Sequence, residues 1–156
     1  MDPKSSVSIA IRLLAKLIPW LILKCFPEKR LDDLLEIFPR PTGDSVDIYF
    51  PGRRATCWLR VINLTPFEIK LDRVEVKVVA GGVALLIHKV MPEVVQSLGR
   101  VEVFCEDSFD ADPEAFKLAK AEEKIRLEIS GHIVLRNRSF TVKRSFDDLR
   151  GYRING

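Results

Sequence analysis

The sequence predicts a mainly β protein, an antiparallel sandwich preceded by N-terminal helices. Apolar and charged residues alternate through Phe67, Ile69 and Leu71, which is the period of a strand with one buried face. Similar short apolar runs recur from Val46 to Phe146, and glycine or proline turns separate them. With 156 residues, 47% apolar and 30% charged, the chain suits one domain with its own core. Strands at this spacing favour two packed sheets.

The centre of the predicted sandwich is residues 55–79, which predict two strands joined by a polar corner. After Leu71 the apolar residues resume at Val74 with the opposite parity. A slip of one residue would turn every side chain to the other face, so we expect a β-bulge at Asp72–Arg73. The residues expected in the core of the sandwich include Phe67, Leu71, Leu127 and Ile129.

The other strands follow from the same alternation and from turn residues. Gly81–Gly82 predicts a hairpin turn, and Gly131 predicts a bulge inside a long strand. Asp112 is a suitable N-cap and Pro113 suits the first helical position, so a short helix is expected from 113 to 124. These strands are expected at residues 46–50, 83–87, 90–98, 101–105, 125–135 and 140–146.

Residues 5–26 form a strongly apolar segment that three cations interrupt. On a helix, Ser8, Arg12 and Lys16 stack as a narrow polar stripe on an apolar cylinder. Pro19 would kink or end that helix. Trp20 follows Pro19, and tryptophan is favoured at membrane–water interfaces. The residues expected to contact a membrane are Arg12, Lys16, Leu17, Trp20, Leu21 and Lys24.

Three interpretations of this apolar segment remain open from the sequence. A helix lying in the interface, or a re-entrant anchor, keeps the polar stripe wet and buries the rest. A spanning helix would bury at least two cations at about 2.5–3.5 kcal/mol each. The third is a helix that packs on the protein's own sandwich or on a second copy. We expect a membrane-associated protein with an N-terminal anchor, and these helices are also where a protein partner or a homo-oligomer would form.

A short amphipathic helix is expected after Pro27, because Leu31, Leu34, Leu35 and Phe38 recur at helical spacing. The proline- and glycine-rich stretch 39–43 predicts a linker. The predicted division is therefore an N-terminal region of residues 1–43, an autonomous sandwich of residues 44–150 and a tail of residues 151–156.

The net charge of +3 is unevenly distributed along the chain. Residues 1–30 hold six lysines and arginines against two acidic residues, and so do residues 136–156. Basic ends around an acidic middle favour contact with an anionic surface, for which phospholipid is the simplest candidate. We expect no nucleic-acid partner, because no basic recognition helix or arginine–aromatic platform accompanies the charge.

The residues that could carry chemistry do not form a recognisable catalytic or metal-binding motif. Cys25, Cys57 and Cys105 lack metal-ligand spacing, and the two later ones are expected in strands as small core residues, with a disulfide between them left open. His88 and His132 are expected on the solvent face of their strands. An acidic loop at 106–114 lacks the glycine and terminal glutamate of a calcium loop. We therefore expect no enzyme activity, no cofactor and no metal.

The segment from Trp58 to Val78 resembles the late-embryogenesis-abundant group 2 domain, also called the water-stress and hypersensitive-response domain. Asn63, Pro66 and Phe67 match its Asn-Pro-Asn-x-Phe corner, while Leu64 and Thr65 replace the usual Pro-Asn. The resemblance covers roughly residues 45–146.

This resemblance implies an immunoglobulin/fibronectin-like sandwich without an active site, linked to stress tolerance or to membranes. The corner residues would be structural. The function expected is a membrane-associated interaction or scaffold protein; the alternative is a module that binds a lipid or another apolar ligand at a membrane surface.

Overall fold

The structure is a computed structural model in which the described residues form two β-sheets, the short helix α3 and a few further helical residues. They are residues 25–41, 45–110, 114, 117–118, 120, 125–135, 138–149 and 152–155. The helix and strands are α3 (Glu28–Asp33), β1 (Leu35–Pro39), β2 (Val46–Tyr49), β3 (Arg54–Asn63), β4 (Ile69–Ala80), β5 (Val83–Val95), β6 (Gly99–Ser108), β7 (Ile125–Leu135), β8 (Arg138–Leu149) and β9 (Tyr152–Asn155).

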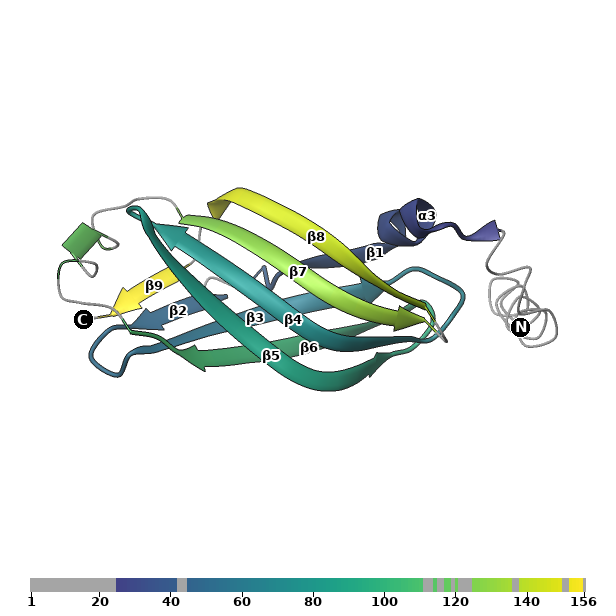
Figure 1. Ribbon diagram of the computed structural model, residues 1–156, viewed down its shortest axis with the longest axis horizontal. Helices are drawn as coiled ribbons and strands as arrows, with labels where there is room; N and C mark the ends of the chain where they lie inside the picture. The colour runs from purple at the N-terminus through teal and green to yellow at the C-terminus, as the bar shows by residue number, and fades with distance from the viewer. Residues whose placement is uncertain are drawn as a thin grey trace.

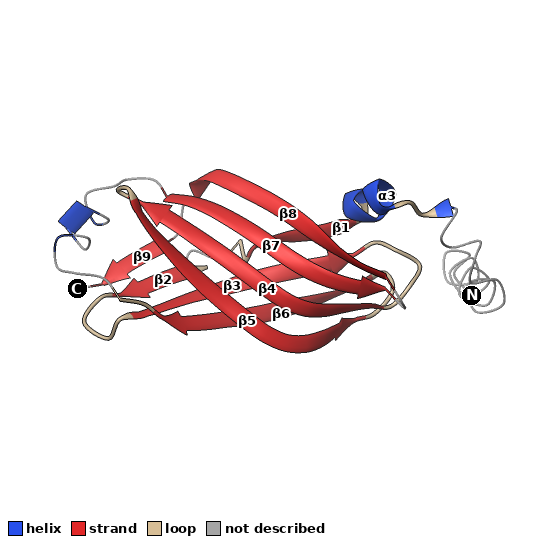
Figure 2. Ribbon diagram, viewed as in Figure 1, coloured by secondary structure: helices blue, strands red, loops and turns tan. Residues whose placement is uncertain are grey.

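The two sheets stack face to face as an elongated sandwich (Figures 1 and 2). In the first sheet β3 is central, with β6 along one side and β1 and β2 in succession along the other; β9 pairs with β2 in parallel. The second sheet is antiparallel, in the order β5-β4-β7-β8. The prediction of a mainly β sandwich is therefore confirmed.

Hydrogen bonds also tie the sheets together along both sides of the sandwich. On one side β5 lies beside β6, and Lys89 Nζ donates to the Phe104 carbonyl. On the other side Arg144 of β8 reaches α3 and β1: its Nη1 donates to Asp32 Oδ1 at 3.1 Å, and its Nη2 donates to the Leu35 carbonyl at 2.8 Å. Arg144 thus fixes the start of the described chain to the second sheet.

The core lies between the sheets and contains the residues expected there. Phe67, Leu71, Leu127 and Ile129 are all buried. The register of β4 shifts between Leu71 and Arg73 against both of its neighbours, which confirms the predicted bulge. The parity change in the sequence is thus absorbed at one point, and both halves of β4 direct their apolar side chains into the core.

The prediction of an amphipathic helix that continues through Phe38 is wrong beyond Asp33. The helix ends at Asp33, and Leu35–Pro39 form β1, which pairs with β3. Leu35 and Ile37 are fully buried there, so pairing with a free strand edge and burial against the second sheet outweigh the helical spacing of the leucines. Because β1 and β9 both belong to the first sheet, the sandwich extends beyond residues 44–150 on both sides.

Three smaller predictions can also be compared with the structure. The expected segments at 83–87 and 90–98 are one strand, β5, which ends at Val95. Gly131 is not a bulge, since it pairs in register with Val74 and Val142. Its lack of a side chain serves packing instead, because a Cβ here would lie 2.4 Å from Ile37 Cδ1. The helix expected from 113 to 124 lies mostly outside the described residues.

This close approach gives a test of how β1 packs. We expect Gly131→Ala to lower the free energy of unfolding by about 1–3 kcal/mol, the usual cost of overpacking a core. Ile37→Val removes the methyl group that the new Cβ would meet, so the double variant should be more stable than the sum of the two single changes predicts. Urea denaturation of the three variants measures this coupling. Strictly additive losses would contradict the contact.

Candidate functional site

The corner between β3 and β4 is built around the side chain of Asn63, which is completely buried. Its Nδ2 donates to the carbonyls of Phe67 at 2.7 Å, Gln96 at 3.0 Å and Val95 at 3.1 Å. Its Oδ1 accepts from the Thr65 backbone N–H at 3.0 Å and from the Thr65 hydroxyl at 2.6 Å. One side chain therefore closes the corner and fastens it to the end of β5.

Thr65 stands where the corner motif usually has asparagine, and the corner remains closed. Thr65 is buried, and its hydroxyl also accepts from the Phe67 N–H at 3.3 Å. Pro66 is half-buried and Phe67 is buried. The predicted structural residues Asn63, Pro66 and Phe67 thus lie together, and Thr65, which the sequence marks as a departure, belongs to the same network.

This corner is also where the N-terminal segment meets the sandwich. The ring of Phe26 packs edge-on against Phe67, with 5.1 Å between centroids. The Arg30 guanidinium lies 5.2 Å from the centroid of the Phe26 ring and donates to the Cys25 carbonyl. We call the end of the sandwich that holds residues 63–68 and 96–98 the corner end; it is the end beside α3 in Figure 1.

The residues expected to contact a membrane lie outside the described residues: Arg12, Lys16, Leu17, Trp20, Leu21 and Lys24. Within the part of the chain that the structure describes, no helix combines the length and the apolar character needed to cross a bilayer.

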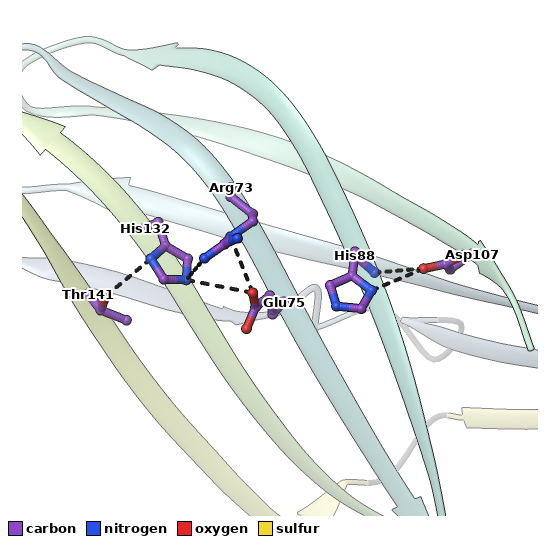
Figure 3. A network of polar contacts seen from close by, with 6 residues as sticks. All are labelled: Arg73, Glu75, His88, Asp107, His132 and Thr141. Carbon is purple, nitrogen blue, oxygen red and sulfur yellow. Dashed lines mark hydrogen bonds and ion pairs between the residues drawn. The ribbon is translucent and has the colours of Figure 1, made fainter.

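A polar network covers the outer face of the second sheet (Figure 3). Arg73 lies between Glu75, with Nε 3.2 Å from Oε1, and His132, with Nη2 3.1 Å from Nε2. His132 Nδ1 lies 3.2 Å from the Thr141 hydroxyl, and its Nε2 also lies 3.8 Å from Glu75 Oε1. These contacts hold the imidazole within a network of surface polar groups.

A shallow pocket of about 390 Å³ lies beside this network. Charged and hydroxyl side chains share its lining with a few apolar ones. The lining residues are Asp72, Arg73, Val90, His132, Ile133, Val134, Ser139, Phe140 and Thr141. Among the described residues, no three His, Cys, Asp or Glu side chains gather as metal ligands would.

The second histidine, His88, forms a smaller pair with Asp107 across β5 and β6 (Figure 3). The His88 backbone N–H donates to Asp107 Oδ2 at 3.1 Å, and the ring Nδ1 is 3.3 Å from the same oxygen. The backbone hydrogen bond is the main reason that the pKa of Asp107 lies below its usual range. Both histidines are on the outer face of their strands, as expected.

Cys57 and Cys105 face each other across β3 and β6 as buried free thiols. Burial raises the pKa of Cys105 to about 11 and that of Cys57 further still. Both thiols therefore stay protonated at neutral pH, which makes them poor nucleophiles and poor metal ligands. They pack as small core residues.

The outer face of the first sheet carries an aromatic pair that the sequence analysis did not single out. Trp58 and Phe104 lie with their ring centroids 4.8 Å apart, and Arg40 stacks 4.8 Å from the Trp58 ring. Arg60 donates to Glu102 at 2.7 Å, and this hydrogen bond lowers the pKa of the glutamate. The alternation of β3 and β6 puts these residues outward, but only the register, Trp58 opposite Phe104 and Arg60 opposite Glu102, brings them together.

Two packed, mostly antiparallel sheets define the chain as a β-sandwich protein. No family model matches the sequence, and no curated protein matches it.

The fold is similar to that of several solved structures. A Northeast Structural Genomics Consortium target is 10% identical with a TM-score of 0.52, over 74% of this chain and 86% of the other. A candidate late embryogenesis abundant (LEA) protein is 12% identical with a TM-score of 0.47, over 96% and 87%. The ligand-binding region of serine-glutamate repeat protein A of Enterococcus faecium is 11% identical with a TM-score of 0.42, over 78% and 97%. The first supports the sandwich fold alone.

Proposed function

We propose that this chain is a non-enzymatic, membrane-associated protein whose sandwich serves as an interaction or scaffold module. The observation that carries the proposal is the junction at the corner end. There Phe26, the last residue of the apolar segment, packs on Phe67, and Arg30 stacks on Phe26. Phe26 thus lies at one defined end of the sandwich, beside a cation suited to a lipid phosphate.

The composition of the apolar segment supports a membrane as its destination. Ten Val, Ile and Leu residues between positions 7 and 23 would leave a large apolar surface in water if nothing covered them. Arg12 and Lys16 fall on one side of a helix there, so they can meet anionic headgroups while the rest is buried. An anchor in the interface satisfies both groups of residues at once.

The finer assignment is a stress-related domain of the LEA group 2 type with an immunoglobulin-like sandwich. Its support is the corner motif: Asn63, Pro66 and Phe67 stand at the motif's positions. The half-buried pair Trp58 and Phe104, with its flanking arginines, is the surface that we assign to protein partners, because aromatic and arginine side chains dominate such interfaces.

Vesicle flotation tests the anchor. Full-length protein should float with phosphatidylcholine–phosphatidylserine vesicles at low salt and stay largely bound at high salt, because salt weakens only the ionic part of binding. Arg12→Glu with Lys16→Glu should weaken binding to these vesicles at least roughly thirtyfold, since each lost cation contributes about 1 kcal/mol. Binding to pure phosphatidylcholine should change far less.

The matched control is Lys70→Glu with Lys77→Glu, which changes the net charge equally on the exposed face of β4. If both double variants weaken binding alike, net charge rather than the anchor is responsible. A wild-type protein that stays monomeric and never floats would mean that the segment packs on its own sandwich. Lipid that copurifies with the protein would favour the alternative, an apolar-ligand-binding module.

A further inference from the structure

Two exposed leucines lie at the tips of neighbouring loops at the corner end. Leu64 is in the β3–β4 corner and is 43% exposed; Leu98 is in the β5–β6 turn and is 58% exposed. The Leu98 N–H donates to the Thr65 carbonyl at 3.2 Å, which holds the two loops side by side. Both leucines are thus exposed at the end of the sandwich where Phe26 packs on Phe67.

The backbone at Leu98 is unfavourable for a leucine. Its φ is +54°, a left-handed conformation that glycine and asparagine adopt readily and that a bulky side chain rarely does. The side chain is not compensated by burial, because more than half of it is exposed. Residues held in such a conformation cluster at active sites, ligand-binding sites and switch regions.

The backbone N–H groups of Leu64 and Leu98 are hydrogen-bonded within the protein. The Leu64 N–H donates to the Leu34 carbonyl at 2.9 Å, and the Leu98 N–H is also bonded. The Asn63 amide satisfies three further carbonyls. These loops expose Leu64 and Leu98 together with Glu68 and Gln96, whose side chains hydrogen-bond to each other at 3.0 Å. Unbonded backbone groups are costly at membrane depth, whereas bonded loops can enter the headgroup region.

We propose that the corner end faces the bilayer and that Leu64 and Leu98 insert at the boundary between headgroups and acyl chains. The sandwich then stands end-on, held by the apolar segment and steadied by the two leucines. This inference rests on the proposed membrane association and adds the orientation of the sandwich. Lipid is the occupant because Phe26, the last residue of the proposed anchor, packs on Phe67 at this same end, so anchoring brings these leucines to the bilayer surface.

A fluorophore that responds to polarity tests this orientation. Leu64→Cys, Leu98→Cys and the control Leu86→Cys are each labelled in full-length protein carrying Cys25→Ser; Cys57 and Cys105 are buried and do not compete. Leu86 is 47% exposed, as Leu64 nearly is, but lies near the start of β5 at the opposite end. On adding phosphatidylcholine–phosphatidylserine vesicles, probes at 64 and 98 should shift to the blue and brighten severalfold, and the probe at 86 should not change.

Flotation of the same labelled samples separates this inference from the proposed function. Protein that floats while the probes at 64 and 98 stay unchanged, or while the probe at 86 responds equally, overturns the end-on orientation and leaves the anchor standing. Protein that does not float overturns the anchor and the orientation together. Protein that floats with a response at 64 and 98 alone supports both.

A second measurement tests whether Leu64 and Leu98 stabilise the fold instead of contacting lipid. Leu64→Asn with Leu98→Asn should leave the melting temperature unchanged or slightly higher, because asparagine tolerates the left-handed conformation. Quenching by brominated lipids of a probe placed on the exposed neighbouring loop residue, Gln96→Cys, should fall in this variant relative to the wild-type background. A melting temperature lowered as much as by truncation of a core leucine would show the leucines to be structural and overturn the proposal.

Discussion

A fragment spanning residues 44–156 should fail to fold cooperatively, whereas a fragment spanning residues 26–156 should melt in one transition. The shorter fragment lacks β1, whose Leu35 and Ile37 are 0% and 1% exposed. Truncating one such residue to alanine costs about 2–5 kcal/mol. Losing both, together with the hydrogen bonds to β3, removes much of the roughly 5–15 kcal/mol that stabilises a domain.

Circular dichroism with thermal denaturation distinguishes the two fragments. The longer fragment is the matched control, because it also lacks the apolar segment but retains α3, β1 and the contact of Phe26 with Phe67. The shorter one should also aggregate, since removal of β1 uncovers the edge of β3 from Leu59 to Asn63. Equal melting temperatures for the two would mean that the sandwich is autonomous from residue 44 and that β1 contributes little.

The expectation of a boundary at residue 43 shows where sequence patterns are ambiguous. Leu31, Leu34, Leu35 and Phe38 recur at helical spacing, yet Leu35 and Ile37 also alternate as in a strand. Local propensity cannot decide between these patterns, because the deciding partner, the edge of β3, is more than twenty residues away. The bulge in β4 needed no distant partner: its parity change is visible within one strand, and it is confirmed.

The corner shows the same limit for the candidate site. Asn63 and Phe67 could be recognised from the motif, but the partners of Asn63 at Val95 and Gln96 come from another strand end. In the sequence, Thr65 is a departure from the corner motif. Its role is visible only in the structure, where its hydroxyl donates to the Asn63 side-chain oxygen. Likewise, Ile37 of β1 is the reason that residue 131 must be glycine, a requirement invisible in the sequence of β7.

Asn63→Ala should lower the free energy of unfolding by about 3–5 kcal/mol. The change deprives the carbonyls of Phe67 and Val95 of their donor and leaves the Thr65 N–H and hydroxyl without their acceptor. Each buried polar group left unsatisfied costs about 1–3 kcal/mol, and water entering the corner recovers part of that loss. Urea denaturation at neutral pH measures the difference. A matched control is Asn155→Ala, whose amide donates to Asp47 at an exposed site and should change stability by no more than about 0.5 kcal/mol.

Asn63→Asp separates the roles of the two ends of this side chain. It keeps an oxygen for Thr65 but replaces the donor with an oxygen that faces the carbonyls of Phe67, Val95 and Gln96. Burial and these acceptors disfavour the ionised form, so the folded-state pKa of the new carboxyl should lie above its unfolded value. The folded state then binds the proton more tightly, and the variant should regain stability as the pH falls through that raised pKa. Asn63→Ala has no such group and should show no regain relative to the wild type, so equal pH profiles for the two variants would mean that the donor contacts do not hold the corner.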